Sequence, residues 1–188
     1  MDTKTLIGLV TIAIGVVSYS FYFRDIFRGK TKPEAYSWLI WSVLATITFF
    51  AQRASGAGPG AWATLLTAVV CLMISLIAFK KRYAHLKIID VVSLVGALIA
   101  LGLWCYTSRP LLAVVLVVII GACGFVPTLS KAYRHPLEET ATTFALNALK
   151  FLLAIFALDT LAPVTWLYPA SLVVMNSVLV TLITLRRR

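Results

Sequence analysis

The chain has 188 residues, of which 61% are apolar and only 13% are charged, and its formal net charge is +10. A soluble domain carries about 25% charged residues, and large exposed apolar patches are rare on soluble monomers. The basic residues lie in short clusters between apolar runs, which is typical of membrane proteins and argues against a nucleic-acid partner. We therefore predict an all-α polytopic membrane protein whose surroundings are a lipid bilayer.

A helix that crosses a bilayer needs about 20 mostly apolar residues. The chain contains segments of this kind separated by short connections, and they are 4–23, 36–53, 61–79, 88–106, 110–130, 140–158 and 164–185. The first segment has no small-residue cleavage site after it, so we interpret it as a retained helix and not as a signal peptide. The sequence therefore predicts seven transmembrane helices.

The basic residues indicate the orientation of these helices. Those that follow the first, third, fifth and seventh segments are Arg24, Arg28, Lys30, Lys32, Lys80, Lys81, Arg82, Lys87, Lys131, Arg134, Arg186, Arg187 and Arg188. With seven spans, all of them fall on one side, which the positive-inside rule assigns to the cytoplasm. We expect the N-terminus outside and the C-terminus inside.

Two parts of the chain resemble each other at a fixed offset. Pro59-Gly60-Ala61-Trp62 begins the third segment and Pro163-Val164-Thr165-Trp166 begins the seventh, and each is followed by a valine pair, Val69-Val70 or Val173-Val174. Such self-similarity is typical of a duplicated unit. We predict a three-helix bundle in residues 1–84, a linker helix in 85–108 and a second three-helix bundle in 109–188. The linker helix makes the two repeats parallel, related by an axis along the membrane normal.

This plan resembles the SWEET and PQ-loop superfamily of small membrane transporters, which have three, one and three helices and an outside N-terminus. The resemblance also includes a proline late in the first helix of a repeat, Pro127, and an asparagine midway along the last helix, Asn176. Thr128 stands where the superfamily's Pro-Gln dipeptide has its glutamine. The resemblance implies a transporter fold in which two bundles face each other and rock to give alternating access.

Lys150 is the residue most indicative of a site, because it lies in the middle of an apolar segment. An ionisable side chain at this depth usually faces a cavity or a partner. Asn147 and Thr143 precede it on the same helical face, and Asn176 lies at a similar depth in the last segment. We predict that these residues bind substrate. The alternatives are a structural polar contact between helices and a lysine that extends toward the membrane surface.

Aromatic residues, a proline and the cysteines complete the candidates. Trp41 could stack on a ligand or belong to an interfacial aromatic belt, and we assign Trp38 to such a belt. Pro127 disrupts backbone hydrogen bonding and is a candidate hinge, although a static kink repaired by neighbouring helices is the alternative. The cysteines have no metal-binding spacing, and we expect each of them to be a buried thiol.

From these patterns we predict a transporter of a small polar solute, such as a sugar, an amino acid or an organic anion. The chain carries no catalytic constellation, so we expect neither an enzyme nor a bound cofactor or metal. A non-transporting receptor or assembly factor on the same fold is the alternative. We expect an integral protein of a bacterial plasma membrane, and the sequence leaves open whether the chain forms homo-oligomers.

Overall fold

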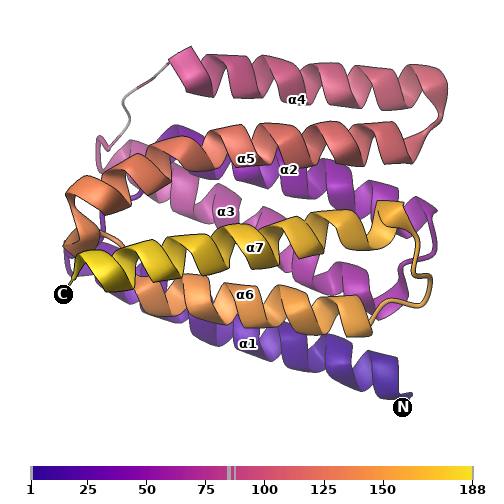
Figure 1. Ribbon diagram of the computed structural model, residues 1–188, viewed down its shortest axis with the longest axis horizontal. Helices are drawn as coiled ribbons and strands as arrows, with labels where there is room; N and C mark the ends of the chain where they lie inside the picture. The colour runs from indigo at the N-terminus through magenta and orange to yellow at the C-terminus, as the bar shows by residue number, and fades with distance from the viewer. Residues whose placement is uncertain (1, 84–85, 87, 188) are drawn as a thin grey trace.

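The computed structural model describes residues 2–83, 86 and 88–187, and within these ranges it contains helices and no strands (Figure 1). The long helices are α1 (Thr3–Phe27), α2 (Ala35–Ala54), α3 (Trp62–Lys80), α4 (Ile88–Thr107), α5 (Pro110–Arg134), α6 (Ala141–Phe156) and α7 (Pro163–Arg186). Short 3-10 helices precede α3 and α6, and they are η1 (Gly58–Ala61) and η2 (Pro136–Glu138). Each predicted segment corresponds to one long helix, with ends that differ by a few residues.

Local sequence signals account for several helix ends. The Asp2 carboxylate accepts a hydrogen bond of 2.9 Å from the Thr5 backbone N–H and caps the start of α1. Gly29 follows the end of that helix with a φ of +70°, a conformation that glycine adopts without steric cost. Pro110 and Pro163 occupy the first position of α5 and α7, where a missing N–H costs no helical hydrogen bond.

Six of the long helices have the length and composition to cross a membrane. The exception is α6, which has 16 residues and is therefore about 24 Å long at 1.5 Å per residue. The hydrocarbon core of a bilayer is about 30 Å thick, so the helical part of α6 alone is too short to cross it. It is also shorter than the segment 140–158 predicted from the sequence. It ends early because the chain turns at Ala157 and Leu158, which are both buried.

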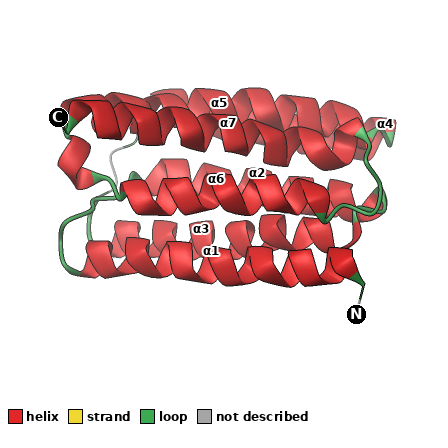
Figure 2. Ribbon diagram, turned by 60° about the horizontal axis from the view of Figure 1, so that its bottom comes forward, coloured by secondary structure: helices red, strands yellow, loops and turns green. Residues whose placement is uncertain are grey.

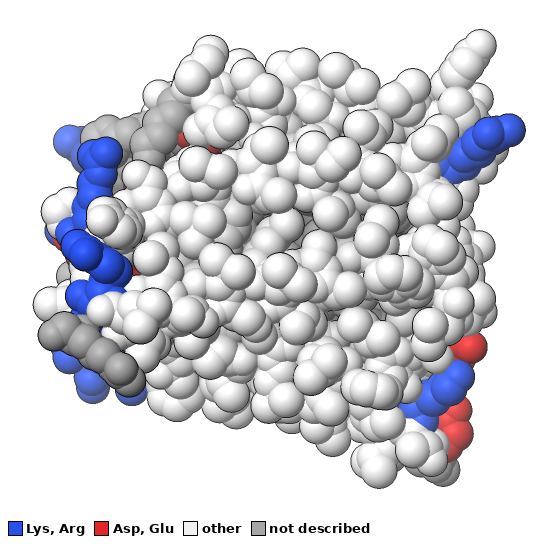
Figure 3. Space-filling model, viewed as in Figure 1, with Lys and Arg blue, Asp and Glu red and all other residues white. Residues whose placement is uncertain are grey.

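The charged side chains lie at the two ends of the helix bundle. On the face shown in Figure 3, most of the lysines and arginines gather at the end where the C-terminus lies, and a broad band without charged residues separates them from the opposite end. The two chain termini lie at opposite ends of the bundle (Figures 1 and 2). We call these the N-terminal end and the C-terminal end of the bundle. An apolar band between charged ends is the surface expected of an integral membrane protein.

The helices pack in a regular pattern. Helix α3 contacts both α1 and α2, and α7 contacts both α5 and α6. Between these two groups, α1 packs against α6 and α2 packs against α5. Helix α4 packs against α5 and α2 at the edge of the bundle (Figure 1). The buried core therefore lies mainly between the group α1–α3 and the group α5–α7, and α4 contributes Ala97 at its edge.

Candidate functional site

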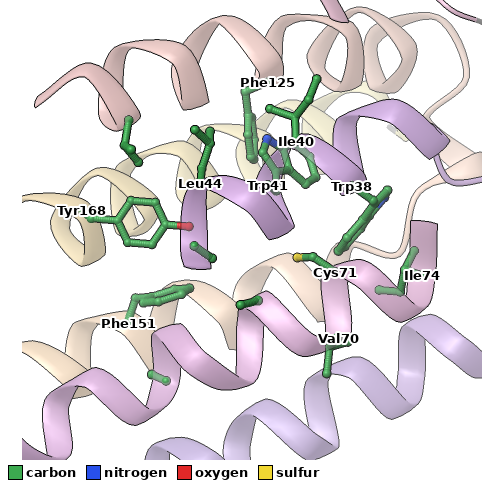
Figure 4. Packing of buried hydrophobic residues seen from close by; sticks show 14 of the residues in the cluster. Trp38, Ile40, Trp41, Leu44, Val70, Cys71, Ile74, Phe125, Phe151 and Tyr168 are labelled. Atoms are coloured by element: carbon green, nitrogen blue, oxygen red, sulfur yellow. The ribbon is translucent and has the colours of Figure 1, made fainter. Parts of the chain in front are cut away.

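A cavity lies at the interface between the two groups of helices. Its walls are formed by Tyr19, Trp38, Trp41, Thr67, Cys71, Phe125, Phe144, Asn147, Phe151, Tyr168, Leu172 and Asn176. These residues come from α1, α2, α3, α5, α6 and α7, and Figure 4 shows several of their side chains pointing toward one another across the interface. The cavity has a volume of about 40 Å³, which is room for about three water molecules.

Lys150 is fully buried beside this cavity, in the middle of α6. Its Nζ donates a hydrogen bond of 2.8 Å to Thr67 Oγ1 and one of 3.3 Å to the Tyr19 hydroxyl. The same nitrogen lies 4.8 Å from the ring centroid of Tyr19 and 4.3 Å from that of Phe151. Lys150 is not itself in the cavity wall, but three residues that contact its ammonium group are.

The hydroxyl groups around Lys150 have a definite hydrogen-bonding order. Thr67 donates its proton to the Ala63 carbonyl oxygen at 2.8 Å, so its oxygen is left to accept from Lys150. The Tyr19 hydroxyl donates to Thr67 Oγ1 at 3.3 Å and accepts from Lys150 in turn. No ion pair joins Lys150 to a carboxylate within residues 2–83, 86 and 88–187. The ammonium group is therefore solvated by hydroxyl oxygens and aromatic rings, without a compensating negative charge.

The structure brings Asn147, Asn176 and Trp41 together in the cavity wall. Asn147 lies one turn before Lys150, and its Oδ1 is buried without a hydrogen-bond partner in the described part of the chain. Asn176 approaches from α7, where its Nδ2 donates to the Leu172 carbonyl oxygen of the same helix at 2.7 Å.

Thr143 is not in the cavity wall, although it shares the buried side of α6. Its hydroxyl donates to the Ser18 carbonyl oxygen at 3.0 Å, and the Ser18 hydroxyl donates back to the Thr143 carbonyl oxygen at 2.9 Å. This reciprocal pair fastens α6 to α1. The structure therefore puts Thr143 in a helix–helix contact, next to the other candidates but turned away from the cavity.

Aromatic rings form a continuous chain from α6 to α5 along one side of the cavity. Ring centroids are 6.2 Å apart for Phe144 and Tyr22, 4.8 Å for Tyr22 and Trp38, and 5.2 Å for Trp38 and Trp41. The chain ends at Phe125, whose ring lies 5.0 Å from that of Trp41. These rings close the cavity toward the C-terminal end of the bundle. The prediction of an interfacial belt position for Trp38 is wrong, because its side chain is only 4% exposed and lines the cavity.

The remaining candidates are arranged as follows. Helix α5 continues through Pro127, which is buried, and a hinge at this position stays a prediction.

The expectation of buried thiols is correct for Cys71, which lines the cavity, and wrong for Cys105 and Cys123, which are exposed on the bundle surface. Both lie on helix faces that have no neighbouring helix to cover them.

The sequence alone does not indicate most of the aromatic and hydroxyl residues that surround Lys150. Tyr19 and Thr67 are 131 and 83 residues away from it along the chain, and each stands among apolar residues that have ordinary helical patterns. The sequence does indicate their depth in the membrane. A hydroxyl in the interior of one transmembrane helix lies at a similar depth to a lysine in the interior of another, so the two could meet. Depth alone does not indicate which helix faces which.

Contacts between the two groups of helices close the C-terminal end of the bundle. The Thr140 hydroxyl donates to Asp25 Oδ2 at 3.0 Å and shares a hydrogen bond of 2.8 Å with the Thr31 hydroxyl. Nearby, Lys131 Nζ pairs with the buried Glu139 at 2.8 Å and also donates to the Lys32 carbonyl oxygen. Burial raises the pKa of Glu139 above its usual value, and the Lys131 ammonium opposes this rise only in part.

The N-terminal end is closed by backbone contacts between η1 and the connection from α6 to α7. The Gly60 N–H donates to the Ala157 carbonyl oxygen at 3.0 Å, and the Asp159 N–H donates to the Ala57 carbonyl oxygen at 3.1 Å. Beneath them, Gln52 Nε2 donates to the Thr165 carbonyl oxygen at 2.7 Å. The two groups of helices are thus joined by direct contacts at both ends of the bundle.

Comparison with models of known protein families, with curated proteins and with solved structures finds no match to this chain.

Proposed function

We propose that this chain is a membrane transporter of a small polar solute, similar in plan to the SWEET and PQ-loop superfamily. The solute would bind in the cavity between α1–α3 and α5–α7 and pass through it by alternating access. The observation that carries this proposal is the fully buried Lys150 beside a cavity at the interface of two helix groups. Ionisable side chains in such positions mark substrate pathways in membrane proteins, and transporter sites form near the midplane between repeats.

The packing pattern supports two parallel three-helix repeats. The first group corresponds to the second when α1 is matched with α5, α2 with α6 and α3 with α7. Under this match, the contacts that α3 makes with the other two helices of its group correspond to those that α7 makes in its own group. The contact of α1 with α6 becomes that of α5 with α2. Helix α4 has no equivalent under this match, which fits its proposed role as the linker between residues 1–84 and 109–188. In this proposal α6 crosses the membrane as the seventh span, with its short helix extended by buried residues at the turn that follows.

The charge distribution supports an orientation with the C-terminus in the cytoplasm and the N-terminus outside. The C-terminal end of the bundle carries the basic residues that follow α1, α3, α5 and α7. The opposite end carries Lys4, Arg53 and Arg109. Positive charge in short loops marks the cytoplasmic side. We propose the plasma membrane of a bacterium as the location.

The two closed ends suggest how access would alternate. Each end is held by a few hydrogen bonds between the two groups of helices, so rocking one group against the other would break the contacts at one end while those at the other end persist. In the conformation described here the two groups are in contact at both ends, and the cavity would have to widen for a solute larger than a few water molecules. Pro127 in α5 is the proposed site of bending, since a proline removes one helical hydrogen bond.

Uptake by purified protein in liposomes tests this proposal. Radiolabelled glucose, glycine and L-lactate represent the three solute classes, and protein-free liposomes give the background. We expect saturable uptake of at least one of them, loss of that uptake in Lys150→Met, and normal uptake in Lys80→Met, which removes an exposed lysine at the end of α3. Saturable binding without uptake of any solute would instead favour a receptor and would overturn the transport proposal.

A further inference from the structure

We infer that the cavity binds a small hydroxylated monocarboxylate, with the carboxylate on the side of Lys150, whose amine lies behind Tyr19, Thr67 and Phe151 of the wall, and the hydroxyl against Asn147. This inference rests on the proposed function and names the solute class of the same site. The ammonium group of Lys150 is fully buried, and its hydrogen bonds go to the neutral hydroxyls of Thr67 and Tyr19. An anionic ligand would stabilise the charged form of this buried amine, because the two opposite charges would compensate each other.

The acidic side chains of the chain lie too far away to compensate Lys150. Asp2 and Asp159 are at the N-terminal end, and Asp25, Glu34, Asp90, Glu138 and Glu139 lie at or near the C-terminal end. Lys150 stands ten residues into the 16-residue α6, away from both groups. A ligand with one negative charge would therefore make the centre of the protein neutral, whereas a second charge would again be unpaired.

A second polar group of the ligand is indicated by Asn147. Asn147 lines the cavity, and its Oδ1 is buried and has no hydrogen-bond donor among the described residues. Side chains three residues apart on a helix are neighbours, so Asn147 and Lys150 can contact adjacent groups of one small molecule. A hydroxyl on the carbon next to a carboxylate would supply the missing donor.

The rest of the cavity wall argues against a sugar. Apart from Asn147 and Asn176, the wall of α5, α6 and α7 consists of Phe125, Phe144, Phe151, Tyr168 and Leu172. One of the two Asn176 amide N–H groups and the Thr67 proton are already used on carbonyl oxygens of their own helices. The several hydroxyls of a sugar would each need a partner, and unpaired buried hydroxyls are costly. A ligand with one carboxylate and one hydroxyl needs fewer partners than a sugar, and the Tyr168 hydroxyl and the unpartnered Trp41 Nε1 of the wall could also donate to it.

Binding of radiolabelled L-lactate to the purified protein tests this inference, with close analogues as competitors. Lactamide has the shape of lactate without the charge, and propionate keeps the charge without the hydroxyl. We expect saturable lactate binding, competition by lactamide at least tenfold weaker, and intermediate competition by propionate. Lys150→Met should abolish lactate binding, and Lys80→Met should leave it unchanged. Asn147→Leu should weaken lactate binding to the level of propionate without changing propionate binding.

The outcomes separate this inference from the proposed function. If lactamide or glucose competes as well as lactate, or if correctly folded Lys150→Met still binds lactate, the inference is overturned, while uptake of glucose or glycine would keep the transport proposal. If lactate binds through Lys150 but is not taken up by liposomes, the anion site stands and transport does not. The comparison of lactate with lactamide uses the wild-type protein, so it decides the matter even if a variant fails to fold.

Discussion

Lys150 Nζ and Thr67 Oγ1 are joined by a hydrogen bond of 2.8 Å, although the two residues are 83 positions apart. The bond links the middle of α6 to the middle of α3, and so it crosses the interface between the two groups of helices. It also places the Lys150 amine where its hydrogen-bond acceptors, among the described residues, are the hydroxyls of Thr67 and Tyr19. A contact that costs this much desolvation is expected to add little to the stability of the fold.

Lys150→Met should leave the protein at least as stable as the wild type. Replacing buried ionic groups with apolar residues of similar volume is often neutral or stabilising by about 1–4 kcal/mol, and Tyr19 and Thr67 already hydrogen bond to each other at 3.3 Å. Thermal unfolding of both proteins in detergent measures this. A clear fall in the midpoint temperature would mean that Lys150 is a structural contact between helices, and that reading would replace the binding role.

Glu139 should make the stability of the protein depend on pH. Because burial raises the pKa of this carboxyl above its usual value of 4.5, the folded protein binds a proton that the unfolded protein has already released. Stability then falls as the pH rises from about 4.5 through the raised value. Glu139→Gln should remove this dependence. The free energy of unfolding of both proteins, measured between about pH 4.5 and 8, tests this dependence. A wild-type stability that increases with pH in this window would contradict a raised pKa of Glu139.

The fold was largely accessible from the sequence, because its signal is local. Runs of apolar residues bounded by prolines, glycines and basic clusters gave each of the long helices, and the ends differ where local chemistry extends or shortens a helix. For example, α5 continues from the predicted 130 to Arg134, where Pro136 follows, and α6 stops at Phe156 instead of 158. The packing of the helices was less accessible, since apolar helices carry little pattern that distinguishes one neighbour from another.

The candidate site was accessible only in part. Lys150, Asn147, Asn176 and Trp41 stand out because polar or bulky residues in a transmembrane segment are unusual, and the structure gathers them at one cavity. Their partners could not be found in this way, because tyrosine, threonine and phenylalanine are ordinary in such segments. Thr143 behaves differently from Asn147, although helical spacing puts both on one face of α6. Four residues advance a helix by about 40° more than one full turn, and this difference directs Thr143 to the Ser18 carbonyl oxygen on α1.

Labelling of single cysteines should put the two termini on opposite sides of the membrane. In a variant whose native cysteines are replaced by alanine, Thr3→Cys and Arg187→Cys provide one site at each end of the bundle. An impermeant maleimide added outside intact cells should label Thr3→Cys, and Arg187→Cys only after the cells are broken. Labelling of both sites from the same side would contradict seven membrane crossings.

Gly60→Ala should loosen the closure of the N-terminal end. A Cβ added at Gly60 would lie 2.8 Å from the Ala154 carbonyl oxygen and 2.6 Å from Leu158 Cδ2, so η1 and α6 would have to separate. We expect faster modification of Cys71 in the cavity by a water-soluble thiol reagent added from outside. Gly102→Ala is the matched control, because an added Cβ there meets nothing within 4 Å. Equal modification rates in the two variants would show that this contact does not control access.

The most direct test of the account is the accessibility of Cys71 from each side of the membrane. Cys71 is buried in the wall of the cavity, so a membrane-impermeant, negatively charged methanethiosulfonate can reach it only when one end of the bundle opens. With Cys105 and Cys123 replaced by alanine, alternating access predicts modification from the outside in right-side-out vesicles and from the cytoplasmic side in inside-out vesicles. Modification from one side only, or from neither although the denatured protein reacts fully, would contradict a central cavity that opens alternately to both sides.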